Sequence, residues 1–209
     1  MVQTHYKTST PIYKMELKPN HIKINGQNVE LSKLLQKTQF DSDWENDFYT
    51  FLKEWYSDED FIHVQSSGST GKPKTIELKK DFVAASAQRT LNYFNLKAND
   101  TILHCLPTKY IAGKLMLVRA IVGKLNLHLI DPTSDFAILK KEAFRFAAMV
   151  PTQVSKLFAL ETWNLEQLLI GGDAISTKLE KQLQEIETKC FSSYGMTETA
   201  THIAIRKLN

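Results

Sequence analysis

The residues with the clearest capacity for chemistry lie in one short stretch, Ser66 to Lys74, which reads SSGSTGKPK. It combines hydroxyl groups and glycines with the positive charges of Lys72 and Lys74. Glycines in a loop leave backbone N–H groups free to approach a phosphate closely, and the hydroxyls add further donors. Apolar, extended segments precede and follow the stretch. We therefore expect a loop between two strands that binds an anion.

This loop does not have the spacing of the ATP P-loop, GxxxxGK[ST]. Gly68 lies too close to Gly71 and Lys72, and Pro73 follows the lysine. A nucleotide-binding fold of that class is therefore disfavoured. A surface hairpin with solvated lysines is the alternative that the stretch alone leaves open.

The elements that must position this loop alternate along the rest of the chain. Strand candidates are TILHCL, LNLHLI, FAAMV and QLLIGG, and helical candidates are DFVAASAQRTLNYF, AGKLMLVRAIVG, PTQVSKLFAL and STKLEKQLQEIE. Such alternation predicts an α/β fold with mainly parallel sheets flanked by helices. Ligands of such folds bind at the carboxyl ends of the strands.

The first sixty residues have a different character. Asn25-Gly26 is a favoured hairpin turn pair, and Ser42 with Glu45 predicts a capping box at the start of an amphipathic helix. The aromatic stripe of that helix is expected to pack in the core. We therefore expect residues 1–60 to form a short region, hairpin plus helix, packed on residues 61–209.

Composition excludes several other classes of function. The chain has 209 residues, 43% of them hydrophobic, and a net charge of +3 at pH 7. Its charges are interleaved without a basic stripe, which disfavours a nucleic-acid partner. Its 2 cysteines and 6 histidines match no metal-ligand spacing. Without a signal peptide or an apolar run of membrane-spanning length, the sequence predicts a cytoplasmic protein with no membrane span.

Two later segments extend the interpretation of the loop. They are LLIGGDAI, Leu168 to Ile175, and SSYGMTET, Ser192 to Thr199. In this order, the three segments resemble the signatures of the adenylate-forming superfamily, which includes acyl-CoA synthetases, firefly-type luciferases and adenylation domains of peptide synthetases. The resemblance runs from about Phe61 to the C-terminus. It implies that the chain folds as the large N-terminal domain of that superfamily and that the enzyme activates a carboxylic acid.

The resemblance also implies ATP, Mg²⁺ and coenzyme A as ligands. Thr197 would bind the α-phosphate, Glu198 would hold Mg²⁺, and Lys74 would add positive charge, so these are the expected catalytic residues. Tyr194 would stack on the adenine. The expected nucleotide-binding residues are Ser66, Ser67, Gly68, Ser69, Thr70, Gly71, Lys72, Gly171, Gly172, Tyr194, Gly195 and Thr197.

Within the superfamily, LPTKYIAGKLMLVRA and MVPTQVSKL most resemble the o-succinylbenzoate–CoA ligases of menaquinone biosynthesis. Tyr110, Gly113 and Arg119 are the expected substrate residues, with Arg119 as the partner of a carboxylate. Tyr110 stands where that family has a histidine, which leaves another aryl or fatty acid open as the substrate.

The superfamily's hinge and small C-terminal domain, with its catalytic lysine, have no counterpart in the sequence. The sequence is therefore interpreted as a large-domain portion without a C-terminal domain, with little or no ligase activity of its own. A fragment of a longer enzyme is the favoured explanation. A non-catalytic nucleotide-binding remnant is the alternative.

Overall fold

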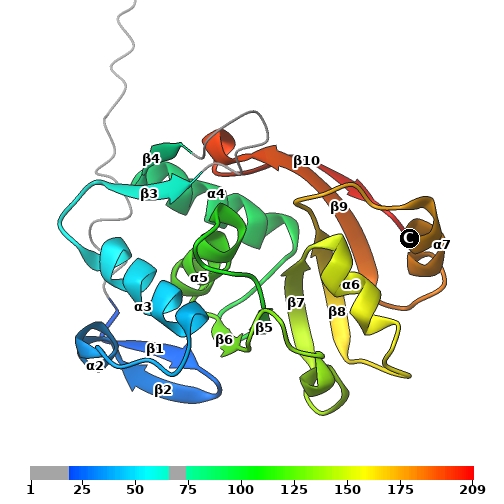
Figure 1. Cartoon of the computed structure of the whole chain (residues 1–209), viewed down its shortest axis with the longest axis horizontal. Coiled ribbons are helices and arrows are strands. Elements are labelled where there is room, and N and C mark those ends of the chain that lie inside the picture. The colour runs from blue at the N-terminus through cyan, green and yellow to red at the C-terminus, as the bar shows by residue number, and fades with distance from the viewer. Residues whose placement is uncertain (1–18, 66–73) are drawn as a thin grey trace, which may run out of the picture.

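The computed structural model describes residues 19–65 and 74–209 (Figure 1). The strands are β1 (His21–Ile24), β2 (Gln27–Glu30), β3 (Phe61–Gln65), β4 (Thr75–Lys79), β5 (Thr101–His104), β6 (Asn126–Leu129), β7 (Phe144–Met149), β8 (Leu165–Ile170), β9 (Lys189–Met196) and β10 (Thr201–Lys207). The helices are α2 (Leu31–Gln36), α3 (Asp43–Tyr56), α4 (Lys80–Tyr93), α5 (Ile111–Gly123), α6 (Pro151–Leu157) and α7 (Thr177–Leu183), with 3₁₀ turns η1 (Ala137–Lys140) and η2 (Thr197–Thr199). None of the described helices is long and apolar enough to cross a membrane.

Eight of these strands form one sheet, in the order β10-β9-β8-β7-β5-β6-β1-β2. All the pairs from β9 across to β1 are parallel, and the pairs β9–β10 and β1–β2 at the two edges are antiparallel. Each strand expected from the alternating pattern is present in this sheet. The predicted mainly parallel α/β fold is confirmed.

Helices cover both faces of the sheet, as Figure 1 shows for α4 and α5 against α6 and α7. Neighbouring residues of one strand point to opposite faces, so Ile102 packs with α4 and α5 whereas Leu103 packs with α6 and α7. The central strands are apolar on both faces for this reason. The sheet is the rigid base on which the connecting loops are held.

The N-terminal hairpin extends this sheet. Asn25 and Gly26 both have positive φ, at 49° and 75°, which the favoured two-residue turn requires. Asn25 also fastens the hairpin to β6, because its N–H donates to the Leu127 carbonyl at 2.9 Å and its Oδ1 accepts from the Leu129 N–H at 2.7 Å.

The capping box predicted for α3 is wrong, although Ser42 is its N-cap residue. The Ser42 hydroxyl is buried and bonds no described group. The Glu45 carboxylate accepts from the N–H of Asp41 at 3.0 Å, one residue before the N-cap. The chain direction before the helix thus brings a different N–H within reach of the glutamate.

Strands β3 and β4 form a separate antiparallel pair, with Gln65 opposite Thr75. The predicted anion-binding loop joins these two strands, and its residues 66–73 lie outside the described residues. The expectation that strands flank the loop is confirmed.

Candidate active site

A cleft of about 1560 Å³ lies at the carboxyl ends of the parallel strands. Its floor includes Leu106 after β5, Val150 after β7 and Gly171 after β8, and the last residues of β9 form one wall. This is the place where open α/β sheets bind ligands. The cleft thus lies at the edge of the sheet where the alternation of strands and helices predicts ligand binding.

The described residues that the sequence singled out all line this cleft. They are Lys74, Tyr110, Gly113, Arg119, Gly171, Gly172, Tyr194, Gly195, Thr197 and Glu198. The expected loop residues Ser66, Ser67, Gly68, Ser69, Thr70, Gly71 and Lys72 lie outside the described residues. The roles given to individual residues stay predictions.

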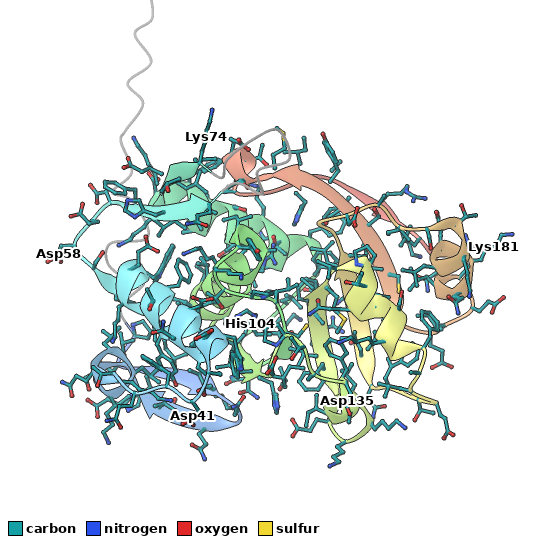
Figure 2. All side chains as sticks on the ribbon, in the orientation of Figure 1. Asp41, Asp58, Lys74, His104, Asp135 and Lys181 are labelled. Atoms are coloured by element: carbon teal, nitrogen blue, oxygen red, sulfur yellow. The ribbon has the colours of Figure 1, made fainter. Side chains whose placement is uncertain are left out.

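The strand that follows the predicted loop meets the SSYGMTET segment at one rim of the cleft. Strand β4, which follows the loop, contacts η2, which carries Thr197 and Glu198. Figure 2 shows Lys74 at the same edge of the molecule as η2. Lys74 and Gln65, the two described residues that flank the loop, both line the cleft.

The turn at η2 is closed by its own side chains. The Thr199 hydroxyl donates to the Met196 carbonyl at 2.8 Å and accepts from the Met196 N–H at 3.1 Å. The Ser86 hydroxyl of α4 donates to the Ala200 carbonyl at 3.4 Å. Thr197 and Glu198 thus lie on a short, anchored turn, which suits residues that must hold charged ligand groups in place.

The glycine pair after β8, Gly171 and Gly172, lies beside the segment SSYGMTET, and Gly171 packs directly against its Ser193. A Cβ atom at Gly171 would lie 2.4 Å from the hydroxyl oxygen of Ser193, which itself donates to the Ile170 carbonyl at 3.1 Å. Gly172 has a φ of +84°, a conformation that favours glycine. The backbone conformation of Gly172 therefore favours glycine, and a side chain at Gly171 would have to displace the Ser193 hydroxyl, whether or not a ligand lies against them.

The first turn of helix α5 packs very closely against the loop that precedes it. A Cβ atom at Gly113 would lie 2.3 Å from the carbonyl oxygen of Pro107. This close approach places Tyr110, which is 47% exposed, at the rim of the cleft, whereas Arg119 is only 3% exposed.

Arg119 is a buried cation without a counter-charge in the described part of the chain. Its Nε is buried and bonds no described group, and one terminal nitrogen contacts the Met116 sulfur at 3.4 Å. Burial lowers the pKa of Arg119 to about 10, so the guanidinium still carries its charge at neutral pH. Leaving a buried charge unpaired is costly. An anionic ligand in the cleft would supply the missing partner.

Several cleft residues were not foreseen from the sequence, among them Gln153, His202 and Arg206. Gln153 donates to the carbonyls of Cys105 at 2.6 Å and Pro132 at 3.0 Å, and so ties the ends of two strands together. Burial, and then the positive charges of Arg119 and Arg89, lower the pKa of His202 to about 4.

No sequence pattern indicated that His202 and Arg206 would both line the cleft. They lie four residues apart in the β10 segment THIAIRK, but an irregularity in the pairing between His202 and Ala204 breaks the alternation of faces along that strand. His104, in contrast, is buried, and its Nε2 lies 3.1 Å from the Thr108 hydroxyl. Its Nδ1 bonds no described group.

The acidic residues at the cleft suit Mg²⁺ bound together with a phosphate ligand. The described residues contain no group of three or more His, Cys, Asp or Glu side chains that could hold a metal by themselves. Mg²⁺ is usually held by one or two carboxylates together with substrate phosphates and water. Glu198 supplies one carboxylate on the cleft, where Asp173 also lies, and it fits that mode of binding.

The sheet and the segments around its cleft define the large domain of an adenylate-forming enzyme. The chain belongs to the family of AMP-binding enzymes, whose family model matches residues 13–209. The resemblance found in the sequence is thereby confirmed. The match also extends over most of the first sixty residues.

Known relatives agree with this assignment. The chain is 29% identical over 143 residues to a 2-succinylbenzoate–CoA ligase of Escherichia coli, covering 68% of this chain and 31% of that protein. The crystal structure of an acyl-CoA synthetase (AMP-forming)/AMP-acid ligase II-like protein from Dyadobacter fermentans has a TM-score of 0.75 and 31% identity, covering 85% of this chain and 53% of the other. The o-succinylbenzoate coenzyme A synthetase of Bacillus subtilis, in complex with ATP and magnesium ion, shares the fold, with a TM-score of 0.64 at 23% identity over 70% of this chain and 32% of the other. The chain spans 31–44% of the length of the first two curated relatives it matches.

Proposed function

We propose that this chain is the larger part of the active site of an acid–thiol ligase. The enzyme would activate a carboxylic acid with ATP and transfer the acyl group to coenzyme A. One observation carries the proposal: a single cleft brings together Lys74, Thr197 and Glu198 with Arg119, a cation without a counter-charge among the described residues. In this proposal residues 61–209 form the nucleotide-binding part, and residues 1–60 pack on it.

In the first step an oxygen of the substrate carboxylate attacks the α-phosphorus of ATP. The bond from that phosphorus to the oxygen bridging to the β-phosphate breaks, so pyrophosphate leaves and an acyl-adenylate remains. Such a step needs in-line positioning and charge neutralisation rather than a protein nucleophile. The Thr197 hydroxyl would donate to the α-phosphate, Glu198 would hold Mg²⁺, and Lys74 would neutralise phosphate charge. Bound Mg²⁺ would withdraw negative charge from the leaving pyrophosphate.

In the second step the thiolate of coenzyme A attacks the acyl carbon. The acyl–oxygen bond to the phosphate breaks, AMP leaves, and the thiol proton passes to solvent. The chain's own thiols are unsuited to replace coenzyme A, because burial raises the pKa values of Cys105 and Cys190 to about 12. They remain protonated and shielded at neutral pH.

The proposed acid is o-succinylbenzoate, since the relatives cited act as 2-succinylbenzoate–CoA ligases. This acid carries two carboxylates. One would react with ATP, and the other would pair with Arg119, whose planar guanidinium suits a carboxylate. Tyr110 at the rim of the cleft supports a second candidate class, another aryl or fatty acid, because an aromatic ring there favours apolar contact.

The experiment that tests the proposal uses a stable mimic of the intermediate, the acyl-sulfamoyl adenosine of o-succinylbenzoate. Isothermal titration should show that this mimic binds the chain about a hundredfold more tightly than AMP, because it fills the nucleotide and acid subsites together. Thr197→Ala should weaken both ligands. Absence of binding of the mimic, AMP and MgATP would overturn the proposed function.

A panel of mimics then separates the acids. Benzoyl and octanoyl sulfamoyl adenosines lack the second carboxylate of the o-succinylbenzoyl compound. If either binds the chain more tightly than the o-succinylbenzoyl mimic, the substrate assignment is wrong and the second class of acid takes its place.

A further inference from the structure

The C-terminal end of α3 joins two walls of the cleft without lining the cleft itself. Glu54 lies in the last turn of this helix. One carboxylate oxygen of Glu54 accepts from the His63 N–H at 2.7 Å and lies 2.9 Å from the His63 Nδ1. The other accepts from the Lys114 ammonium at 3.2 Å. A single side chain therefore connects β3 and α5.

Both partners of Glu54 are next to residues that line the cleft. His63 lies two residues before Gln65, the last residue of β3. Lys114 directly follows Gly113, the residue whose missing side chain allows α5 to approach the Pro107 carbonyl. A shift of either partner would be transmitted to the adjoining wall, because strands and helices move as units.

The Glu54–Lys114 part of this link is largely shielded from solvent, whereas the His63 side chain is 52% exposed. The Lys114 side chain is 10% exposed and that of Glu54 is 21% exposed. The Lys114 ammonium also lies 4.2 Å from the centre of the Phe51 ring. Burial alone would raise the pKa of Glu54, but the bonds from His63 and the charge of Lys114 lower it overall. A buried pair of this kind adds little net stability compared with apolar residues, yet breaking it by removal of one partner is costly.

We propose that Glu54 is a positioning residue, which holds the β3 wall and the α5 wall in the relative placement that the cleft needs to bind its ligands. This inference rests on the proposed function, since the ligands named in its test are MgATP and o-succinylbenzoate. It assigns a role in binding to a residue of the N-terminal region that contacts neither ligand. Preorganisation of this kind lowers the cost of binding.

The test compares ligand affinities of Glu54→Gln and the unchanged chain by isothermal titration, well below the melting temperature of both. Glutamine keeps an acceptor for the His63 N–H but removes the charge that holds Lys114. We expect affinities for MgATP and o-succinylbenzoate to fall roughly threefold to thirtyfold in the folded variant, which is the range seen for residues that couple sites without contacting them. A second variant, Glu54→Gln with Lys114→Met, removes both charges and keeps the test available if the single variant fails to fold.

Lys53→Met is the matched control, because it lies on the same helix and its ammonium donates to the Lys37 carbonyl at 2.7 Å, which ties α3 to the end of α2 instead of the cleft. This variant should lower the melting temperature and leave both affinities unchanged. Equal affinities in the folded Glu54 variants and the unchanged chain would overturn the inference while leaving the proposed function intact. Failure of the unchanged chain to bind MgATP and o-succinylbenzoate would overturn both.

Discussion

At the scale of single residues, the cleft combines a buried charge that destabilises the fold with a glycine that packs tightly against a neighbouring side chain. Arg119 is buried with its Nε unpaired among the described residues, and a Cβ at Gly171 would have to displace the Ser193 hydroxyl. A local loss of stability of this kind is common where a protein binds a ligand. Stability and binding should therefore respond in opposite directions to some substitutions.

Arg119→Met is the clearest case. Replacing an unpaired buried charge by an apolar side chain of similar length should raise the free energy of unfolding by about 1–3 kcal/mol. The same change should weaken o-succinylbenzoate binding roughly tenfold or more, because a charge-assisted hydrogen bond is lost. Denaturant unfolding and calorimetric titration measure the two effects. A variant that binds the acid as tightly as the unchanged chain would show that Arg119 does not hold the substrate.

Gly171→Ala tests the contact between the segments LLIGGDAI and SSYGMTET, which the sequence singled out. The new methyl group would displace the Ser193 hydroxyl from its bond to the Ile170 carbonyl, so we expect a loss of about 1–3 kcal/mol in unfolding free energy. In Gly171→Ala combined with Ser193→Ala the clash disappears. The double variant should therefore lose less stability than the sum of the two single variants, by about 1 kcal/mol or more. Additive losses in chemical denaturation would contradict the packing described.

At the scale of elements, close backbone approaches decide where the walls of the cleft lie. Helix α5 can carry both Tyr110 and Arg119 to the cleft because Gly113 lets it approach the loop after β5. Strand β3 and helix α5 are in turn connected through Glu54. The site is thus positioned by contacts between elements that are distant in sequence.

Gly113→Ala should move α5 away from that loop. The added Cβ would lie 2.3 Å from the Pro107 carbonyl oxygen, which is backbone and cannot rotate away, so we expect a loss of about 3 kcal/mol despite the better helix propensity of alanine. Gly123→Ala at the other end of the same helix is the control. Its Cβ would meet the side chains of Leu91 and Leu125, at 2.9 and 3.0 Å, which can adjust. Comparable melting temperatures for the two variants would contradict this account of the close approach.

At the scale of the whole molecule, one sheet separates two hydrophobic layers, and the buried His104 and the partly exposed His202 belong to this arrangement. His104 lies near the middle of the molecule, as Figure 2 shows, and burial lowers its pKa to about 4. The pKa of His202 is also lowered to about 4, first by burial and then by nearby arginines. Both histidines are therefore neutral in the folded chain at neutral pH.

Acidification should accordingly destabilise the whole fold. Between pH 6.5 and 4 the unfolded chain binds protons at these histidines and the folded chain does not, so the free energy of unfolding falls as pH falls through that window. His104 alone should contribute up to about 3 kcal/mol of this loss. His104→Gln should make the pH dependence of denaturant unfolding clearly shallower. The control His21→Gln, at an exposed site at the start of β1, should not change it. An unchanged slope in His104→Gln would exclude this histidine as a source of the acid sensitivity.

Much of this organisation follows from the sequence alone. The alternation of strands and helices, the turn at Asn25-Gly26 and the order of the signature segments predicted the fold class, the family and the edge of the sheet that carries the cleft. These features depend on side-chain periodicity and turn chemistry, which act over a few residues and can be read along the chain.

Only the tertiary structure decided which distant residues meet. The pairing of Glu54 with Lys114, the unpaired Nε of Arg119 and the position of His202 on the cleft each depend on how separate elements pack. Even the capping box predicted for α3 does not form, because the path of the chain before the helix brings the N–H of Asp41, rather than that of Ser42, within reach of Glu45. Local patterns specify elements and their chemistry, whereas the packing of those elements sets burial and partners, and therefore the charge state and the function available to each group.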